Sequence, residues 1–296
     1  MFRLSRQGLY KRLKATKDKE AVSTLLIDYV KDLRVEQRKL GCVKIYNAFK
    51  AEMHQFAPNV GRDKFLSIMR ENRLLIKRRR KYAVTTNSFH KFRKYKNLVK
   101  DMEVTAPEQL WVSDITYIRT DNGFAYLSLI TDYYSKKIAG FSLHPTLSTK
   151  GPLEALKMAL KGRLYKGNEL MHHSDRGFQY CSDDYVKILQ ENNIKISMTE
   201  NSDPYENAVA ERVNGILKDE FDIDQGFVNN VQADKEIKRV VEIYNNKRPH
   251  MSCMLMTPGK AHLFGKFKMK SWRRLLTKTD LSTKKKKQKE NLQQLK

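Results

Sequence analysis

Two apolar segments separated by a tight polar turn constrain the fold of this chain more than any other feature. Residues 109–119 (QLWVSDITYIR) and 124–134 (FAYLSLITDYY) alternate in hydropathy, are rich in β-branched and aromatic residues, and flank the turn sequence DNG. This pattern is typical of a β-hairpin. Residues 137–144 continue the alternation, so the sequence predicts a three-stranded antiparallel meander.

Helices and strands alternate after the meander. The periodicity of apolar residues predicts helices over 149–163, 182–192, 204–221 and 233–246, and short strands over 170–174 and 194–199. Three antiparallel strands followed by this alternation indicate a mixed α/β domain with helices packed on a sheet.

Three carboxylates lie where such a domain brings distant segments together. Asp114 is in the middle of the first strand, Asp175 comes just after a short strand, and Glu211 is on the helix 204–221, with 60 and then 35 residues between them. Adjacent strands lie ~5 Å apart, so the three acids converge if a helix packs beside the strand ends. Carboxylates that meet repel one another unless a cation lies between them, and an all-oxygen ligand set favours Mg²⁺ or Mn²⁺.

Such a site suits in-line phosphoryl transfer. With two ions ~4 Å apart, one activates a water or hydroxyl and the other stabilises the leaving oxygen of a phosphodiester. Lys218 follows Glu211 by seven residues, which is close to two helical turns and about 10 Å along the axis, so both side chains share one face. We therefore expect Lys218 to hold a neighbouring phosphate.

Other titratable residues have simpler interpretations. His172 and His173, next to the second acid, suggest a metal or base site, but adjacent histidines of this kind are more often structural. Asp132, Asp183 and Asp184 are rival acids. The last two fit better at a helix N-terminus, where the helix dipole favours negative charge.

The net charge of +25 is unevenly distributed along the chain. Lysine and arginine number 27 against 8 acidic residues in 1–100, 18 against 23 in 101–259, and 13 against 2 in 260–296. An acidic middle between basic ends suggests one unit whose chemistry uses carboxylates and flanking units that hold a polyanion, whereas a solvated basic surface is the alternative.

Several short helices precede the α/β domain. Helical periodicity covers 22–34, 43–53 and 62–73, and a basic run follows at once. We expect four residues of that run to contact DNA: Lys77, Arg78, Arg79 and Arg80. The arrangement fits a helix-turn-helix unit with a basic arm and fits a generic helical bundle equally well.

Cysteine usage and hydropathy indicate the compartment. Cys42, Cys181 and Cys253 are odd in number and widely spaced, which is typical of reduced thiols in a cytosolic protein. No apolar run reaches the ~18 residues that a membrane span needs. We therefore expect a cytoplasmic protein that meets nucleic acid and no membrane.

Three motifs together resemble a known catalytic core. WVSDITYI, HHSDRGFQY and PYENAVAERVNGILKDEF, with their spacing and the trailing lysine, resemble the DDE core shared by retroviral integrases and bacterial insertion-sequence transposases. More narrowly, the chain resembles the second reading-frame product (OrfB) of the family-three insertion-sequence transposases. LGCVKIYNAF with RENRLLIKRRRK resembles the helix-turn-helix segment of that family, and YNNKRPHMSCMLMTP resembles its closing motif, so the resemblance covers residues 22–262.

The resemblance implies a ribonuclease-H-like α/β fold, of the retroviral integrase superfamily, preceded by a small all-α helix-turn-helix domain. The implied domains are a basic N-terminal helix (1–21), a helix-turn-helix-like DNA-binding domain (22–81), a basic linker (82–106), the integrase catalytic core (107–262) and a basic, disordered tail (263–296).

The same resemblance implies a site and partners. Asp114, Asp175 and Glu211 would be catalytic and would ligate two Mg²⁺ or Mn²⁺ ions, and Lys218, Arg212 and Asn207 would contact DNA. Members of the family nick one 3′ end, join it to the same strand at the other end, and later insert the resulting circle. The implied partners are double-stranded DNA (terminal inverted repeats and target), the upstream-frame product as a fusion or partner, and further copies of the chain on DNA, at a bacterial nucleoid.

Two alternative functions remain open at this point. One is a ribonuclease-H-like nuclease, since the same fold and metals serve it, although the basic helical domain argues against it. The other is a DNA-binding regulator of transposition without catalytic activity, and the complete set of acids argues against that alternative.

Overall fold

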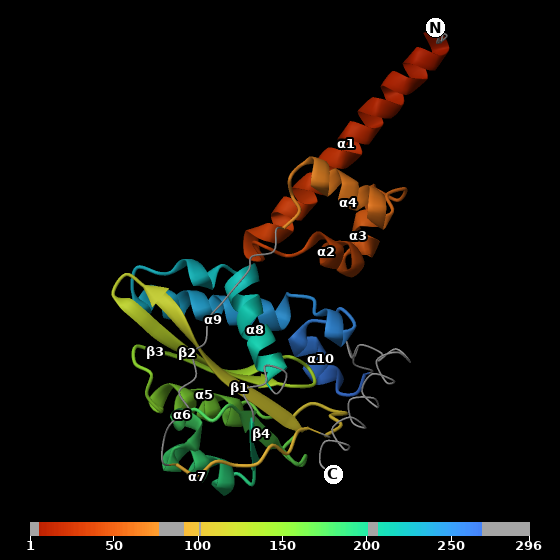
Figure 1. Ribbon diagram of the computed structural model, residues 1–296. Helices are drawn as coiled ribbons and strands as arrows, with labels where there is room; N and C mark the ends of the chain where they lie inside the picture. Colours follow the sequence, from red (N-terminus) through yellow and green to blue (C-terminus); the bar gives the residue numbers. More distant parts are fainter. Residues whose placement is uncertain (1–5, 77–91, 101, 201–206, 268–296) are drawn as a thin grey trace, which may run out of the picture.

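A helical unit precedes a sheet domain in the computed structural model, which describes residues 6–76, 92–100, 102–200 and 207–267 (Figure 1). The helical unit consists of α1 (Arg6–Glu36), α2 (Cys42–Ala48), α3 (Lys50–Phe56) and α4 (Arg62–Glu71). Within the described part of the chain, no helix is long and apolar enough to span a lipid bilayer.

The sheet contains the predicted meander at one side. Its strands are β1 (Leu110–Thr120), β2 (Gly123–Asp132), β3 (Ile138–His144), β4 (Met171–Ser174) and β5 (Lys195–Met198), in the order β3-β2-β1-β4-β5. The first three strands pair antiparallel, and the hairpin closes where Thr120 pairs with Gly123. Because β4 and β5 pair parallel to β1 and to each other, the sheet is mixed, as predicted.

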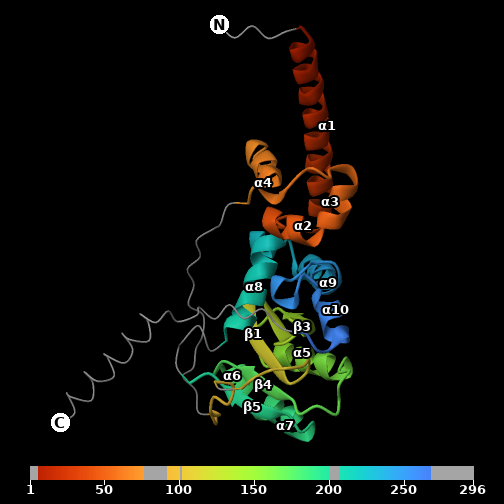
Figure 2. The same cartoon turned by 90° about the vertical axis from the view of Figure 1, so that its right-hand side faces the viewer.

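Helices cover both faces of this sheet. They are α5 (Lys150–Lys161), α6 (Phe178–Cys181), α7 (Asp183–Glu191), α8 (Ala208–Glu220), α9 (Asn230–Asn246) and α10 (Pro258–Phe264), with 3₁₀ turns η1 (Ile223–Gln225) and η2 (Met251–Cys253). One face packs against α8 and α9, and the other packs against α5 and α7 (Figures 1 and 2). This architecture confirms the predicted ribonuclease-H-like α/β class.

The alternation of side chains along β1 decides to which face of the sheet each side chain points. Ile118 packs in the cluster with α8 and α9, whereas Trp111 packs in the cluster with α5 and α7. Successive strand side chains point to opposite faces, so Asp114, four residues before Ile118, lies on the face that α8 covers.

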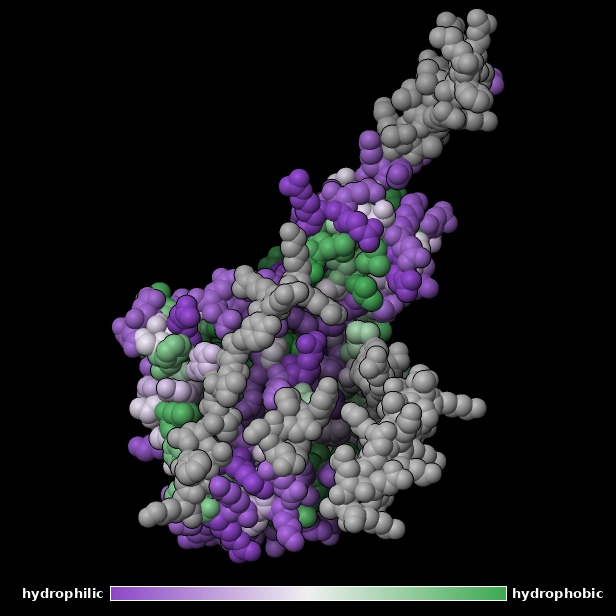
Figure 3. Space-filling model, in the orientation of Figure 1, coloured by the Kyte–Doolittle hydropathy of each residue, from purple (hydrophilic) through white to green (hydrophobic). Residues whose placement is uncertain are grey.

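A separate apolar core holds the helical unit together. Leu26 and Val30 of α1 meet Ile45 of α2, and Phe65 and Met69 of α4, all of them buried. The surface seen in Figure 3 is largely hydrophilic, with an apolar patch on the helical unit. A turn of residues 57–61 joins α3 to α4, and the helix-turn-helix interpretation of this unit stays a prediction.

The structure corrects the expected start of the helical unit. We expected a separate N-terminal helix and a boundary between residues 21 and 22, but α1 runs without a break through both. The intervening sequence TKDKEA has no glycine or proline, so nothing interrupts the backbone hydrogen bonds there. By contrast, the structure divides one expected helix, over 43–53, into two shorter helices, α2 and α3. They meet at Phe49, whose ψ of 23° lies outside the helical region.

Two expected non-core segments contribute to the sheet domain. In the linker, Met198 N donates to Lys96 O (3.3 Å) and Leu98 N to Ser197 Oγ (2.9 Å), so these residues lie beside β5. At the start of the expected tail, the Phe267 ring lies 4.6 Å from the Tyr134 ring. Packed structure therefore continues past residue 262, and the remainder of the tail, 268–296, lies outside the described residues.

Candidate active site

Asp114 is fixed on the central strand by two hydrogen bonds. Its Oδ1 accepts from Ile115 N at 2.9 Å, and its Oδ2 accepts from Asn214 Nδ2 of α8 at 2.7 Å. Asp114 pairs with Leu129 in the register of β1 and β2. The carboxylate is therefore held in the narrow space between the sheet and α8.

Asp175 follows β4 directly and lies beside the same strand. The pairing of Val112 with His173 places the end of β4 beside the first half of β1. Asp175 Oδ1 accepts a hydrogen bond from Gly177 N at 3.0 Å. A Cβ at Gly177 would lie 3.0 Å from that same oxygen, so a larger residue there would displace the Asp175 carboxylate by a few tenths of an ångström.

Glu211 comes from the first turn of α8, and its side chain is exposed. Two amide side chains attach this end of α8 to β1: Asn207 Nδ2 donates to Ser113 O at 3.0 Å, and Asn214 donates to Asp114. The apolar face of α8, including Val213 and Leu217, is buried against the sheet. The helix thus delivers Glu211 to the end of the sheet that holds the two aspartates.

The negative charges of Asp175 and Glu211 both act on Asp114. Burial, with the negative charges of Asp175 and Glu211, raises the pKa of Asp114 to about 7, although the hydrogen bonds from Asn214 and Ile115 act to lower it. Burial also raises the pKa of Glu211. The local donors therefore do not compensate the negative charge that gathers here.

This donor set fits divalent metal ions. The groups are carboxylate oxygens, which Mg²⁺ and Mn²⁺ prefer, and a bound cation would lower the pKa of Asp114. Within the described residues, no three carboxylate, imidazole or thiol groups are already arranged to hold an ion. Binding an ion with all three acids would thus require a rearrangement.

The two adjacent histidines are structural. Both are buried; His172 Nε2 lies 2.7 Å from Ser113 Oγ and 2.9 Å from Tyr185 OH, and His173 Nδ1 lies 2.9 Å from Ser197 Oγ. Burial, with the charge of His173, lowers the pKa of His172 to about 3, so its ring is neutral. The contacts of His172 and His173 therefore fit a structural role better than a metal or base site.

The rival acids have other partners. Asp183 and Asp184 are in the first turn of α7, as expected. Asp132 is buried and accepts from Glu108 N (2.7 Å) and from Ser135 N (2.7 Å). Asp132 lies 3.9 Å from His262 Nδ1, and Glu108 lies 3.2 Å from His262 Nε2, so this second acidic group forms a buried structural network.

The residues expected to contact DNA are placed differently from one another. Lys218 Nζ lies 4.3 Å from the centre of the Tyr117 ring and 4.0 Å from Asp224 Oδ1. Arg212 is exposed, whereas Asn207 is buried and bonded to β1. The four candidates of the basic arm, Lys77, Arg78, Arg79 and Arg80, lie outside the described residues.

Asn214 is the site residue that the sequence analysis missed. It follows Glu211 by three residues on α8, and residues at that spacing share a helix face. That spacing was available in the sequence, but only the packing of α8 on β1 shows that the amide reaches Asp114.

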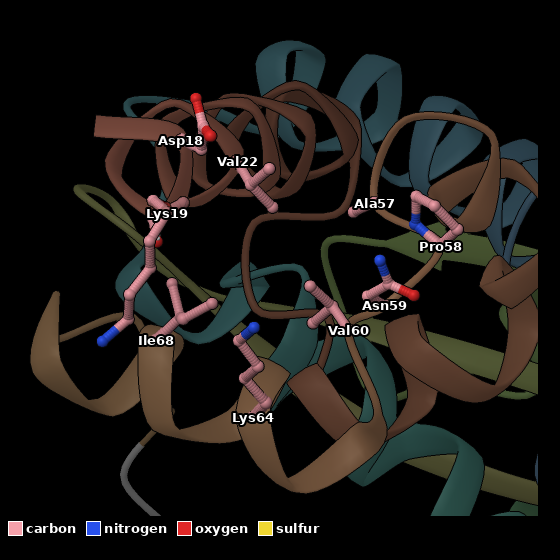
Figure 4. A pocket seen from close by; sticks show the side chains of 10 residues that line it. Asp18, Lys19, Val22, Ala57, Pro58, Asn59, Val60, Lys64 and Ile68 are labelled. Atoms are coloured by element: carbon pink, nitrogen blue, oxygen red, sulfur yellow. Dashed lines mark hydrogen bonds between the residues drawn. The ribbon is translucent and has the colours of Figure 1, made fainter. Parts of the chain in front are cut away.

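A separate pocket lies in the helical unit, far along the chain from the acids. It has a volume of about 310 Å³ and lies between α1, the turn of residues 57–61 and α4 (Figure 4). Val22, Val60 and Ile68 form its apolar walls, and Lys19 and Lys64 lie at its edge. The pocket contains none of the three acids.

Sequence comparisons match the sheet domain to known families. Two families described as "Integrase core domain" match residues 104–204 and 192–258. The "Insertion element IS600 uncharacterized 31 kDa protein" of Shigella sonnei is 37% identical over 202 residues, 68% of this chain and 74% of its own length. The "Transposase InsF for insertion sequence IS3A" of Escherichia coli is 33% identical over 192 residues, 64% of this chain and 66% of its own length.

Solved structures show a more distant likeness. The HTLV-2 integrase catalytic core domain, in complex with magnesium, aligns with 53% of this chain and 97% of its own, at 19% identity and a TM-score of 0.41. The simian T-cell lymphotropic virus intasome aligns with 76% of this chain and 75% of its own, at 18% identity and a TM-score of 0.46.

Proposed function

Because this chain belongs to the IS3-family transposases, whose core is an integrase core domain, we propose that it nicks the 3′ ends of an insertion sequence and transfers them to a new DNA strand. By reaction class it is a polynucleotidyl transferase. The observation that supports the proposal is the packing of α8 on β1, which brings Glu211 within electrostatic reach of Asp114, where the charge of Asp175 also acts.

These three acids are the proposed ligands of Mg²⁺ or Mn²⁺, with two ions in the complete site. When bound, the ions would activate the attacking oxygen and stabilise charge on the phosphodiester. Asn214 would keep the Asp114 carboxylate in place through its hydrogen bond of 2.7 Å. Glu211, exposed on the first turn of α8, would complete the site when DNA approaches.

The DNA backbone would lie along α8. Lys218 is on the same helix as Glu211, and its ammonium group already lies near Tyr117 and Asp224. We propose that Lys218 leaves Asp224 to contact a phosphate, and that exposed Arg212 binds a second one. Asn207, which is buried, would act by holding the start of α8 on β1.

The helical unit and its basic arm are the proposed means of holding the ends of the element. We further propose that the protein acts as an oligomer on double-stranded DNA, with the upstream-frame product as a fusion or partner, at the nucleoid in the bacterial cytoplasm. The proposed domain plan is a helical DNA-binding unit that includes α1, a connecting segment, a catalytic core and a basic tail.

Oligonucleotides that carry the terminal inverted repeats test this function directly. Purified protein with Mg²⁺ or Mn²⁺ should give 3′-end nicks and joined strands, and Glu211→Gln should give neither. Cleavage of RNA–DNA hybrids without joining would favour the nuclease alternative. Binding that weakens with salt, with no metal-dependent products, would favour the regulator alternative.

A further inference from the structure

The helical unit contacts the sheet domain through Glu220, the last residue of α8. Lys44 of α2 places its ammonium group 3.1 and 3.2 Å from the two Glu220 carboxylate oxygens. From the other side, Arg248 donates to the same carboxylate through Nε and Nη2, each at 2.8 Å. Glu220 thus bridges the two parts of the chain, and we call this group the Lys44–Glu220–Arg248 joint.

Three further contacts surround the joint. Lys39 N donates to Glu220 O at 3.1 Å, the Lys39 ammonium group contacts the Asp222 carboxylate, and Lys247 Nζ lies 2.5 Å from Glu36 Oε1. All the contributions from the helical unit come from residues 36–44, where α1 ends and α2 begins. Both ribbon views show α2 at one end of α8 (Figures 1 and 2).

The joint is largely removed from water. The exposed side-chain fractions are 2% for Arg248, 11% for Lys44 and 16% for Glu220. Burial would raise the pKa of Glu220, but Arg248 and Lys44 outweigh burial and lower it. An ion pair with so little solvent around it has a defined geometry, because breaking it would leave a buried charge without a partner.

The two ends of α8 therefore serve two parts of the molecule. Glu211 lies in its first turn at the candidate active site, and Glu220 lies nine residues later at the joint. At 1.5 Å per residue this separation is about 13.5 Å along the axis. Between them, Val213, Ile216 and Leu217 are buried against the sheet. A helix packed in this way transmits the position of one end to the other.

We propose that the Lys44–Glu220–Arg248 joint is a positioning device, which sets the nucleotide at which the Glu211 end of the site acts on DNA held by the helical unit. Lys44 and Glu220 are positioning residues in this scheme and touch no reacting atom. The inference rests on the proposed transposase function. If the joint provided only cohesion, its loss would lower the yield of products without moving the site of cleavage.

The first test measures whether the joint holds the two parts together. Lys44→Glu would face Glu220 with a like charge, and small-angle X-ray scattering of the full chain should show a larger radius of gyration. Lys50 is exposed at the start of α3, away from the joint. Lys50→Glu makes the same charge change there and is the matched control. An unchanged radius for Lys44→Glu would overturn the proposal.

A second variant pair avoids the buried residues. Glu36 and Lys247 are exposed at 44% and 52%, so exchanging their charges does not threaten the core. Glu36→Lys alone should loosen the joint, and Glu36→Lys with Lys247→Glu should restore the wild-type radius. Failure of the double variant to restore it would count against a specific electrostatic contact.

The decisive test maps products at single-nucleotide resolution on terminal-repeat oligonucleotides. In Lys44→Glu the product at the wild-type nucleotide should fall by about 100-fold, the scale expected for a displacement of about 1 Å, while cuts at neighbouring nucleotides appear. Fewer products at an unchanged position would overturn the joint's role and leave the proposed function standing. A wild-type chain that makes no metal-dependent products counts against the proposed function and against this inference together.

Discussion

Asn214 of α8 donates a hydrogen bond to Asp114 of β1 across 2.7 Å, and this contact ties the helix that carries Glu211 to the strand at the centre of the sheet. It brings together residues separated by a hundred positions in the sequence. Because Asp114 is half-buried and the charges of Asp175 and Glu211 act on it, the amide is one of the few donors that offset its charge.

Asn214→Ala should therefore impair the reaction more than DNA binding. Loss of the amide frees the Asp114 carboxylate to rotate, and we expect the rate of strand transfer at saturating Mg²⁺ to fall by about 10- to 100-fold, as for other ligand-supporting contacts. Affinity for the terminal-repeat duplex, measured by fluorescence anisotropy, should stay within about twofold, because the residue positions a carboxylate and is buried. A rate equal to that of the wild type would contradict this role.

Glu211→Gln keeps the size of the side chain and removes its charge. We expect nicking and joining to fall at least about 1,000-fold, because the proposed metal site loses one of three anionic ligands. Glu191→Gln, an exposed position on α7, is the control and should match the wild type. Circular dichroism should show both variants folded, since Glu211 is exposed.

Lys218→Ala tests the proposed phosphate contact by its salt dependence. Removing one phosphate contact should weaken binding to all duplexes alike and reduce the slope of log K against log salt by about one. The control is Lys187→Ala on α7, at an exposed position, which should leave the slope unchanged. An unchanged slope for Lys218→Ala would mean that Lys218 stays with Tyr117 and Asp224 when DNA binds.

The buried network around His262 predicts how stability depends on pH. Burial lowers the pKa of His262, but Asp132 and Glu108 outweigh burial, so the pKa is raised. For the two carboxyl groups burial alone would raise the pKa, but His262 outweighs burial, so both pKa values are lowered. Stability from His262 is therefore complete below its ordinary pKa and is lost as pH rises through the raised value. Stability from the carboxylates is present above their ordinary pKa and is lost as pH falls through the lowered values.

Urea unfolding between pH 4 and pH 9 measures this dependence. His262→Ala should lower the free energy of unfolding at pH 6 by about 3 to 5 kcal/mol, because it removes the buried cation beside Asp132 and leaves Glu108 with Arg163 alone. The loss should shrink as pH rises above the raised pKa, where the wild-type ring is neutral. An equal loss at every pH would contradict a charged imidazole.

Two glycines should respond in opposite directions to alanine. A Cβ at Gly140 of β3 would lie 2.1 Å from Ala155 O of α5, whereas none of the surrounding atoms lies within 4 Å at Gly215 of α8. Gly140→Ala should destabilise by about 3 kcal/mol, since strand and helix must separate. Gly215→Ala should stabilise by about 0.5 to 1 kcal/mol through helix propensity. Thermal unfolding of both variants measures the contrast.

The sequence by itself determined the elements and the chemical character of the site. Alternation along residues 109–134 was enough for the hairpin, because one face of a strand must be apolar where a sheet is covered by helices. The residue types and spacing of Asp114, Asp175 and Glu211 were enough to predict an all-oxygen site, and that site stays a prediction. The hairpin and the predicted site both follow from residue types and spacing along the sequence.

Tertiary structure decided what these residues touch. No local pattern distinguished Asn214 as the donor to Asp114 or Glu220 as the carboxylate between Lys44 and Arg248. The break at Phe49 also differed from expectation, since Phe49 packs against the core of the helical unit, where α2 ends and α3 begins. Contacts between distant residues depend on how helices pack on the sheet, and side-chain packing in three dimensions fixes that arrangement.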